Sequence, residues 1–127
     1  MEIKMKTDCD CMVACFAMLM KWNYEQAAEY FPPKAVSKTG YSFKWLIEYI
    51  KANGIYLTWF DNKNTKPDWA KPAMVDVPSL TAPDKGDHII FWNGERVIDP
   101  SNKEVKYTEL PSEINAVYQI NERWTKV

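Results

Sequence analysis

The chain has 127 residues, and its 16 basic and 17 acidic side chains give a formal net charge of −1 at neutral pH. This length fits a single domain spanning residues 1–127. The balanced charge excludes the strongly basic surface typical of nucleic-acid-binding proteins, so we expect no nucleic-acid partner. With 46% apolar and 26% charged residues, the chain is too hydrophobic to stay disordered, and we expect a soluble globular protein.

The longest apolar stretch covers residues 11–20. It is about half as long as the ~20 residues that a transmembrane helix needs, so we expect a buried helix and no membrane insertion. Acidic Asp8 and Asp10 precede the stretch, and Lys21 follows it without a small-residue cleavage site, which does not fit a signal peptide.

All cysteines of the chain lie in one short segment, at Cys9, Cys11 and Cys15. Disulfides between such close neighbours cannot connect distant parts of the chain, and an odd number of cysteines fits a reducing compartment better than secretion. The cysteine pattern therefore predicts a cytoplasmic protein.

Residues 11–22 carry apolar side chains at helical spacing on every face, which is typical of a helix buried at the centre of a domain. Asp8 or Asp10 is a suitable N-cap. We therefore expect the N-terminus of this helix, with its unpaired amide groups and partial positive charge, to lie at Cys11.

Two further helices are predicted before Gly54. A short one runs from Tyr24 toward Phe31, where Pro32-Pro33 must end it. The next covers residues 43–50, with Ser42 as its N-cap and Asn53-Gly54 as its C-terminal signal. Up to Gly54 the sequence predicts helices alone.

Beyond Gly54 the apolar period changes to that of strands, and turn residues separate the runs. The predicted strands are Ile55 to Phe60, Ala73 to Val77, His88 to Trp92, Glu95 to Ile98 and Ala116 to Ile120. Helices that are segregated from mainly antiparallel strands make an α+β fold. We expect a helical half at residues 8–54, with a central buried helix, packed against a sheet half at residues 55–127.

The strongest local signal is Asn93-Gly94 between two strand-like runs, a pair typical of the two-residue type I′ hairpin turn. With Trp92 opposite Glu95, counting back along both strands places His88 opposite Asp99. Directly opposed residues share a face with Cβ atoms ~4.5–5.5 Å apart, close enough for a carboxylate to accept a hydrogen bond from an imidazole. A β-bulge would change this register.

A histidine oriented by a carboxylate can activate a nucleophile that carries a removable proton. Cys11 is the natural candidate, because a helix N-terminus and a neighbouring imidazolium both favour the thiolate. Asp10 opposes this effect unless its charge is turned away. His88 is the only histidine of the chain.

Several segments together resemble a small stand-alone C39-like peptidase of the bacterial and phage type, a papain-like cysteine peptidase. They are Asp10-Cys11-x-x-Ala14-Cys15-x-Ala17-Met18-Leu19, Tyr24-Glu25-Gln26-Ala27-Ala28, Gly40-x-Ser42, His88-Ile89-Ile90 and Val97-Ile98-Asp99-Pro100. The resemblance implies a papain-like fold and hydrolysis of a peptide or isopeptide bond in a protein or peptide substrate, without cofactor or metal. It implies Cys11 as nucleophile, His88 as general base and acid, Asp99 as the residue that orients His88, and action in the cytoplasm, the host's if phage-encoded.

The sequence departs from the family pattern at two positions. Met5 stands where the family usually has a Gln whose amide, with the backbone N–H of Cys11, stabilises the oxyanion, and Met12 stands where a Gly follows the nucleophile. Loss of one oxyanion donor typically lowers the rate ~10²–10³-fold. Other donors near this position are Lys4, Lys6 and Thr7.

Three other interpretations stay open. In the first, the domain is a catalytically weakened or inactive module that binds a peptide or protein partner, for example in a groove lined by Trp59, Trp69 and Trp92. An NlpC/P60-like cell-wall peptidase also begins a helix with Asp-Cys and a hairpin with His, but it usually uses a third polar residue that is often His. A metal site on Cys9, Cys11, Cys15 and His88 lacks the usual Cys-x-x-Cys spacing.

Overall fold

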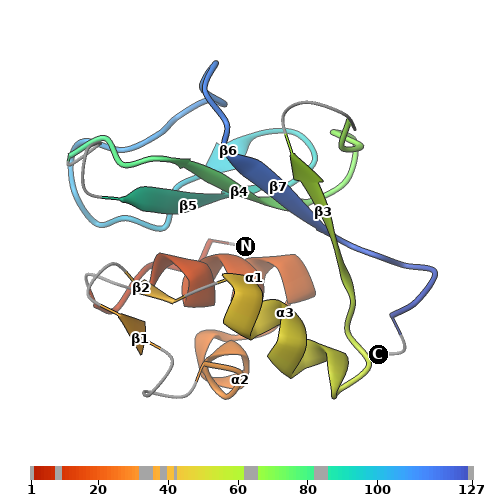
Figure 1. Cartoon of the computed structure of the whole chain (residues 1–127). Coiled ribbons are helices and arrows are strands. Elements are labelled where there is room, and N and C mark those ends of the chain that lie inside the picture. The colour runs from red at the N-terminus through yellow and green to blue at the C-terminus, as the bar shows by residue number, and fades with distance from the viewer. Residues whose placement is uncertain are drawn as a thin grey trace.

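The protein has an α+β fold in which helices cover one face of a five-stranded antiparallel sheet (Figure 1). The computed structural model describes residues 2–7, 10–31, 36–37, 40–41, 43–61, 66–81 and 86–125. The helices are α1 (Cys11–Met20), α2 (Tyr24–Ala28) and α3 (Phe43–Lys51). The strand order in the sheet is β3-β7-β4-β5-β6, with β3 (Leu57–Asp61), β4 (Ala73–Pro78), β5 (Asp87–Trp92), β6 (Val97–Ile98) and β7 (Ala116–Ile120).

Helix α1 is the buried centre that the apolar pattern predicts. Its residues 12–19 are all buried, and the rings of Trp22, Tyr30 and Phe31 pack edge-on around Phe16. The helix ends before Trp22 because Lys21 adopts a left-handed conformation with φ of 59°. The first residue of α1 is Cys11, as expected.

The two other predicted helices are also present. Helix α2 begins with a capping box in which Asn23 and Gln26 exchange side-chain and backbone hydrogen bonds, and it ends at Ala28, earlier than expected. Helix α3 buries Leu46 and Ile50 against the core. Ser42, the predicted N-cap of α3, lies outside the described residues, as do Asp8 and Cys9.

The expectation that the chain is purely helical up to Gly54 is wrong. Strands β1 (Val36–Ser37) and β2 (Gly40–Tyr41) pair as a separate antiparallel hairpin between α2 and α3. Strands this short show no alternation of apolar and polar residues, so periodicity gives no signal for them.

The two faces of the sheet have separate apolar cores. On the helix side, Met74, Phe91 and Tyr118 pack with α1. On the other side, Val75 and Ile90 pack beneath the segments that connect the strands. Alternate residues of each strand therefore serve different cores, as the two-residue period of a strand requires.

The predicted pairing of the β5–β6 hairpin is wrong. Trp92 pairs with Val97 and Phe91 with Ile98, so the turn contains residues 93–96 instead of two residues. The pairing has moved by two positions relative to the predicted Trp92–Glu95 pair. A shift of two residues keeps every side chain on its original face, whereas a shift of one would reverse all of them.

Side-chain hydrogen bonds explain why the turn is longer. Asn93 Oδ1 accepts the backbone N–H groups of Glu95 and Arg96, both at 2.8 Å, and the N–H of Asn93 donates to the Arg96 carbonyl at 3.1 Å. Gly94 has φ of +98°, and a Cβ atom there would lie 2.9 Å from the Ala70 carbonyl oxygen. The Asn side chain thus organises the loop, and Gly94 permits the close approach of the neighbouring segment.

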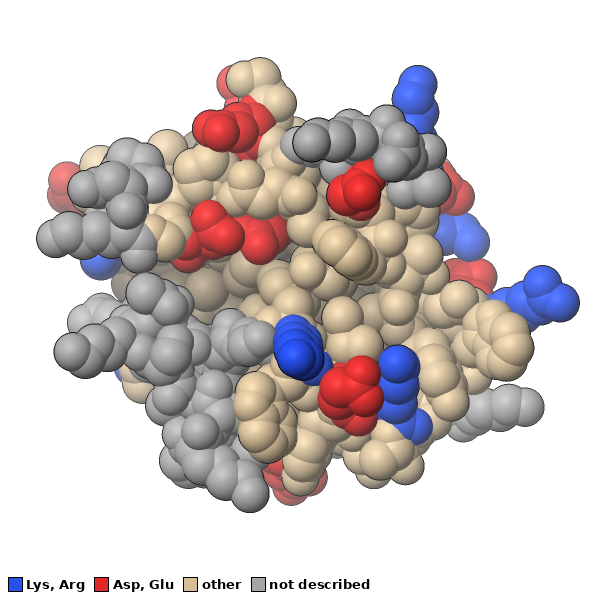
Figure 2. Space-filling model, viewed as in Figure 1, with Lys and Arg blue, Asp and Glu red and all other residues tan. Residues whose placement is uncertain are grey.

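Charged side chains of both signs are interspersed on the face shown in Figure 2. Exposed ion pairs join Glu48 to Lys51 at 3.6 Å and Lys71 to Glu122 at 3.2 Å. Within the described part of the chain, no helix is both long and apolar enough to cross a lipid bilayer.

Candidate active site

His88 and Asp99 share one face of the β5–β6 hairpin, but they are not directly opposed. If the observed pairing is continued past Ile98, Asp99 faces Ile90 and becomes the diagonal neighbour of His88. The ring Nε2 of His88 lies 2.7 Å from Asp99 Oδ1. The predicted direct pairing is therefore wrong, whereas the predicted common face and hydrogen bond are confirmed.

Asp99 is a buried carboxylate with every oxygen engaged. Its side chain is 1% exposed. Besides the His88 ring, Oδ1 accepts the N–H of Ser101 at 2.9 Å, and Oδ2 accepts the N–H of Tyr107 at 2.8 Å. Burial raises the pKa of Asp99, but the hydrogen bonds and the charge of His88 outweigh it and hold the pKa below its usual value. The carboxylate is thus a fixed anion behind the imidazole.

The His88 ring has a neighbour at its face, the Tyr107 ring, as well as the Asp99 carboxylate at its edge. The side chain is 18% exposed and lies nearly parallel to the ring of Tyr107, with centroids 6.5 Å apart. The Tyr107 hydroxyl donates to the Pro78 carbonyl, which fixes Tyr107 in turn. The sequence gives no signal for Tyr107, because it lies in an irregular segment between β6 and β7.

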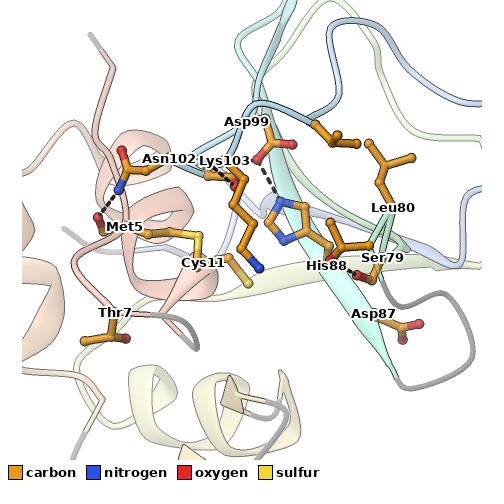
Figure 3. Close-up of a pocket in the computed structure, with 13 residues that line it drawn as sticks. Met5, Thr7, Cys11, Ser79, Leu80, Asp87, His88, Asp99, Asn102 and Lys103 are labelled. Atoms are coloured by element: carbon orange, nitrogen blue, oxygen red, sulfur yellow. Dashed lines mark hydrogen bonds and ion pairs between the residues drawn. The ribbon is translucent and has the colours of Figure 1, made fainter.

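The environment of His88 stabilises its charged form. Burial lowers the pKa of His88, but the hydrogen bond to Asp99 and a hydrogen bond and charge interaction with Cys11 together raise it to about 9. His88 is consequently an imidazolium at neutral pH. Figure 3 shows its ring between Asp99 on one side and Cys11 on the other.

The Cys11 side chain lines the pocket, whereas the carboxylate of the neighbouring Asp10 does not. The Asp10 carboxylate is buried and accepts the N–H groups of Lys6 at 2.8 Å and Thr7 at 3.1 Å, together with the hydroxyl of Tyr24. Asp10 occupies the N-cap position of α1 but makes no side-chain hydrogen bond to the helix. Asp10 is therefore the N-cap residue, as one of the two expected candidates, but its carboxylate fixes the preceding segment instead of bonding the helix N-terminus.

Cys15 lies one turn after Cys11 and has a different environment. It is fully buried, and its Sγ donates to the Ile89 carbonyl at 3.5 Å. Burial raises the pKa of the Cys15 thiol. Cys15 therefore packs as a small apolar side chain, and of these two thiols only Cys11 faces the pocket.

The N-terminal segment lies against the chain that follows Asp99. The N–H of Met5 donates to the Pro100 carbonyl at 2.9 Å, and the Asn102 side chain donates to the Met5 carbonyl at 2.8 Å. The Met5 side chain lines the pocket, and a thioether has no proton to donate. Met5 thus lines the same pocket as Cys11 but brings no hydrogen-bond donor to it.

The basic side chains near Met5 differ in where they point. The Lys4 ammonium lies 3.5 Å from the Asp99 carbonyl oxygen, and the Lys6 ammonium pairs with Glu25 at 2.8 Å. Neither lysine lines the pocket, whereas Thr7 does. Lys103, which the sequence did not suggest, also lines the pocket, and in Figure 3 its side chain points toward Cys11.

The pocket beside Cys11 has a volume of about 200 Å³. Small polar side chains form much of its wall, and Asp87 and Lys103 add charges of opposite sign. The lining residues are Met5, Thr7, Cys11, Ser79, Leu80, Thr81, Asp87, His88, Asp99, Ser101, Asn102, Lys103 and Val105.

The tryptophans proposed to line one groove lie on different faces of the sheet. Trp69 and Trp92 pack edge-on with centroids 5.8 Å apart, and Trp92 Nε1 donates to the Trp69 carbonyl at 2.7 Å. They belong to the core away from the helices. Trp59 instead is 61% exposed beside Phe43 and Tyr118, on the helix side. The predicted common groove is therefore wrong.

Nothing among the described residues forms a group of three or more His, Cys, Asp or Glu side chains able to hold a metal ion. Cys9 of the considered metal site lies outside those residues.

Comparison of the chain with models of protein families finds no match, and comparison with curated proteins finds none either.

Proposed function

We propose that the protein is a papain-like, thiol-dependent hydrolase of peptide or isopeptide bonds. The observation that carries the proposal is the arrangement of three side chains: buried Asp99 is hydrogen-bonded to His88, and the His88 ring lies next to Cys11 in an open pocket. Cys11 stands at the first residue of a buried helix, where the unpaired amides favour an anion.

In this mechanism the Cys11 thiolate attacks the carbonyl carbon of the scissile bond. A carbon–sulfur bond forms, and the carbonyl electrons move onto the oxygen. The His88 imidazolium then donates its proton to the leaving amine as the carbon–nitrogen bond breaks, which leaves a thioester on Cys11. Water attacks the thioester, His88 takes its proton, and the carboxylic acid and the thiolate are released.

Asp99 acts in this scheme as a positioning residue. Its carboxylate holds Nε2 of His88, so the other ring nitrogen faces Cys11. The same charge keeps His88 protonated at neutral pH, as the leaving amine requires.

Met5 favours a second candidate function, a module that binds a peptide without cutting it. A thioether lines the pocket where the family has an oxyanion donor. In that case Cys11 is not needed for binding, and its reactivity has no consequence for the partner.

Thiol labelling and hydrolysis separate the two functions. With iodoacetamide at pH 6–7 we expect Cys11 to react far faster than buried Cys15, with the modified residue identified by tandem mass spectrometry. With a mixed peptide library, Cys11→Ala should abolish cleavage, whereas the matched variant Cys15→Ala should retain it. The hydrolase is contradicted if both thiols are labelled equally slowly, or if cleavage survives Cys11→Ala. The binding module is supported if the protein cleaves no peptide and Cys11→Ala still binds the partner.

A further inference from the structure

We propose that Lys103 supplies the positive charge that stabilises the oxyanion formed at Cys11, an inference that rests on the proposed hydrolase function. Attack by the thiolate moves negative charge onto the carbonyl oxygen. This oxygen must be met by hydrogen-bond donors that are already in place. The described residues around Cys11 limit which side chains can do so.

The side of Cys11 that faces His88 is committed to proton transfer, so the oxyanion needs donors elsewhere. One donor is the backbone N–H of Cys11 at the start of α1, where the Asp10 carboxylate makes no hydrogen bond to the helix. The adjacent position holds Met5, which cannot donate. Thr7 of the same segment offers a neutral hydroxyl at the pocket wall, whereas Lys103 offers a positively charged donor from another segment.

Hydrogen bonds hold segment 99–103 directly beside Met5. The Pro100 carbonyl and the Asn102 side chain bind the backbone of Met5 at 2.9 and 2.8 Å. The N–H of Lys103 donates to Ser101 Oγ at 3.1 Å, which closes a tight turn at this point. Lys103 therefore leaves the backbone close to the place where the donor is missing.

The Lys103 side chain is the charged donor directed at the nucleophile. It lines the pocket and points toward Cys11 (Figure 3), and within the described part of the chain it makes no ion pair. Lys4 and Lys6 are engaged with Asp99 and Glu25 instead. An ammonium group offers three protons on a flexible stem, so it can follow the oxygen from carbonyl to oxyanion.

The step requires no proton transfer at Lys103. The ammonium keeps all its protons while the oxyanion forms and collapses, and the proton for the leaving group comes from His88. Lys103 thus lowers the energy of the charged intermediate without exchanging atoms with the substrate.

Two small reagents test this role without knowledge of the natural substrate. Acetylation of Cys11 by p-nitrophenyl acetate passes through an oxyanion, whereas alkylation by iodoacetamide does not. We expect Lys103→Met to slow acetylation by about 10- to 100-fold. The alkylation rate on its high-pH plateau should stay within about twofold of the parent. The matched control is Lys106→Met, which replaces an exposed lysine that follows segment 99–103 and does not line the pocket.

A second substitution tests the same site from the other side. Met5→Gln places an amide where the thioether lies, so it should restore part of the acetylation rate that Lys103→Met loses. The restoration should be larger than the gain that Met5→Gln gives in the parent protein. Lys103→Arg should retain more activity than Lys103→Met because it keeps the charge.

The outcomes distinguish this inference from the proposed function. If the parent acetylates Cys11 and cleaves peptides, but Lys103→Met does both at the parent rate, the role of Lys103 is wrong and the hydrolase stands. If Lys103→Met raises KM for acidic peptides alone, Lys103 binds a substrate carboxylate and the inference is again wrong. If acetylation and alkylation are slow in the parent and unchanged by Cys11→Ala, the hydrolase itself fails, and the inference fails with it.

Discussion

The buried carboxylate of Asp99 and the partly buried imidazole of His88 are each fixed by several contacts. Two backbone amides hold Asp99, the Tyr107 ring lies against His88, and the two side chains bind each other at 2.7 Å. Because burial disfavours isolated charges, an ion pair of this kind persists only when such partners compensate for lost water. The arrangement fixes both the orientation and the charge of His88.

The pH dependence of acylation follows from this charge. The pKa of His88 is raised to about 9, so the imidazolium, the form that the proposed mechanism requires, is lost only as the pH rises through about 9. We expect the rate of peptide cleavage to fall above that pH. Replacing the Asp99 carboxylate by an amide removes the anion that favours the imidazolium, so Asp99→Asn should move the alkaline limb toward the ordinary value of 6.5.

Rate profiles between pH 5 and pH 10.5 check this expectation. Glu104→Gln, which removes an exposed acid a few residues after Asp99, is the control and should leave the alkaline limb in place. An alkaline limb near 6.5 in the parent protein, or an identical limb in Asp99→Asn, would show that His88 does not carry the titration.

At the scale of elements, the β5–β6 hairpin shows how a correctly predicted His88–Asp99 contact can follow from an incorrectly predicted turn. The sequence predicts a two-residue turn at Asn93-Gly94, yet Asn93 caps a longer loop through its side chain. The register moves by two positions, and the two-residue period of a strand keeps His88 and Asp99 on one face. A shift by one would have separated them.

Other parts of the site could not be predicted. Lys103 and Tyr107 lie in the irregular segment between β6 and β7, where periodicity carries no information and position depends on hydrogen bonds to distant residues. Helix α1 and strand β7, in contrast, agree with their predictions closely, because a long apolar run and a clear β-rich run are strong local signals. The β1–β2 hairpin had neither signal.

The loop of the β5–β6 hairpin is open to a direct test at Gly94. Its φ of +98° disfavours any side chain, and a Cβ atom would also meet the Ala70 carbonyl oxygen at 2.9 Å. We expect Gly94→Ala to lower the free energy of unfolding by about 2–4 kcal/mol. The matched variant Gly54→Ala has a comparable φ of 79° at the end of α3, and should cost about 1 kcal/mol.

Urea unfolding of the parent and both variants measures these differences. Equal losses for the two substitutions would mean that backbone conformation alone matters and that the contact with Ala70 is unimportant. A shifted His88 titration in Gly94→Ala would further show that the loop helps to position the site.

At the scale of the whole molecule, the site lies where the two layers meet. The helix layer contributes Cys11, the sheet contributes His88 and Asp99, and the N-terminal segment connects them through the Met5–Pro100 hydrogen bond. Relative movement of the layers would therefore change the Cys11–His88 contact before it changed either layer. Groups that weaken the packing near this junction affect both stability and the site.

Asp76 of β4 is a partly buried acid near this junction, with Asp87 and His88 close by. It pairs across the sheet with Ile89 of β5, and its Oδ1 atom is buried without a hydrogen-bond partner among the described residues. Burial and the nearby Asp87 carboxylate raise the pKa of Asp76 to about 7, although Asn115 and the charge of His88 act in the opposite direction. An acid in this position holds its proton in the folded protein long after the unfolded chain has lost it.

The sign of the effect on stability follows from proton binding. Below the unfolded value of 3.8 the carboxyl is neutral in both states; between 3.8 and about 7 only the folded state keeps the proton, so stability decreases as pH rises; above about 7 the cost is constant. Asp76→Asn removes this titration. We expect the variant to be more stable than the parent at pH 8, by about 1–3 kcal/mol, with the difference disappearing near pH 4.

Urea unfolding at both pH values measures this difference in stability, with the exposed Glu95→Gln as control for loss of surface charge. A variant that is less stable than the parent at pH 8, or a difference that is equal at both pH values, would show that Asp76 is ionised at no cost in the folded protein.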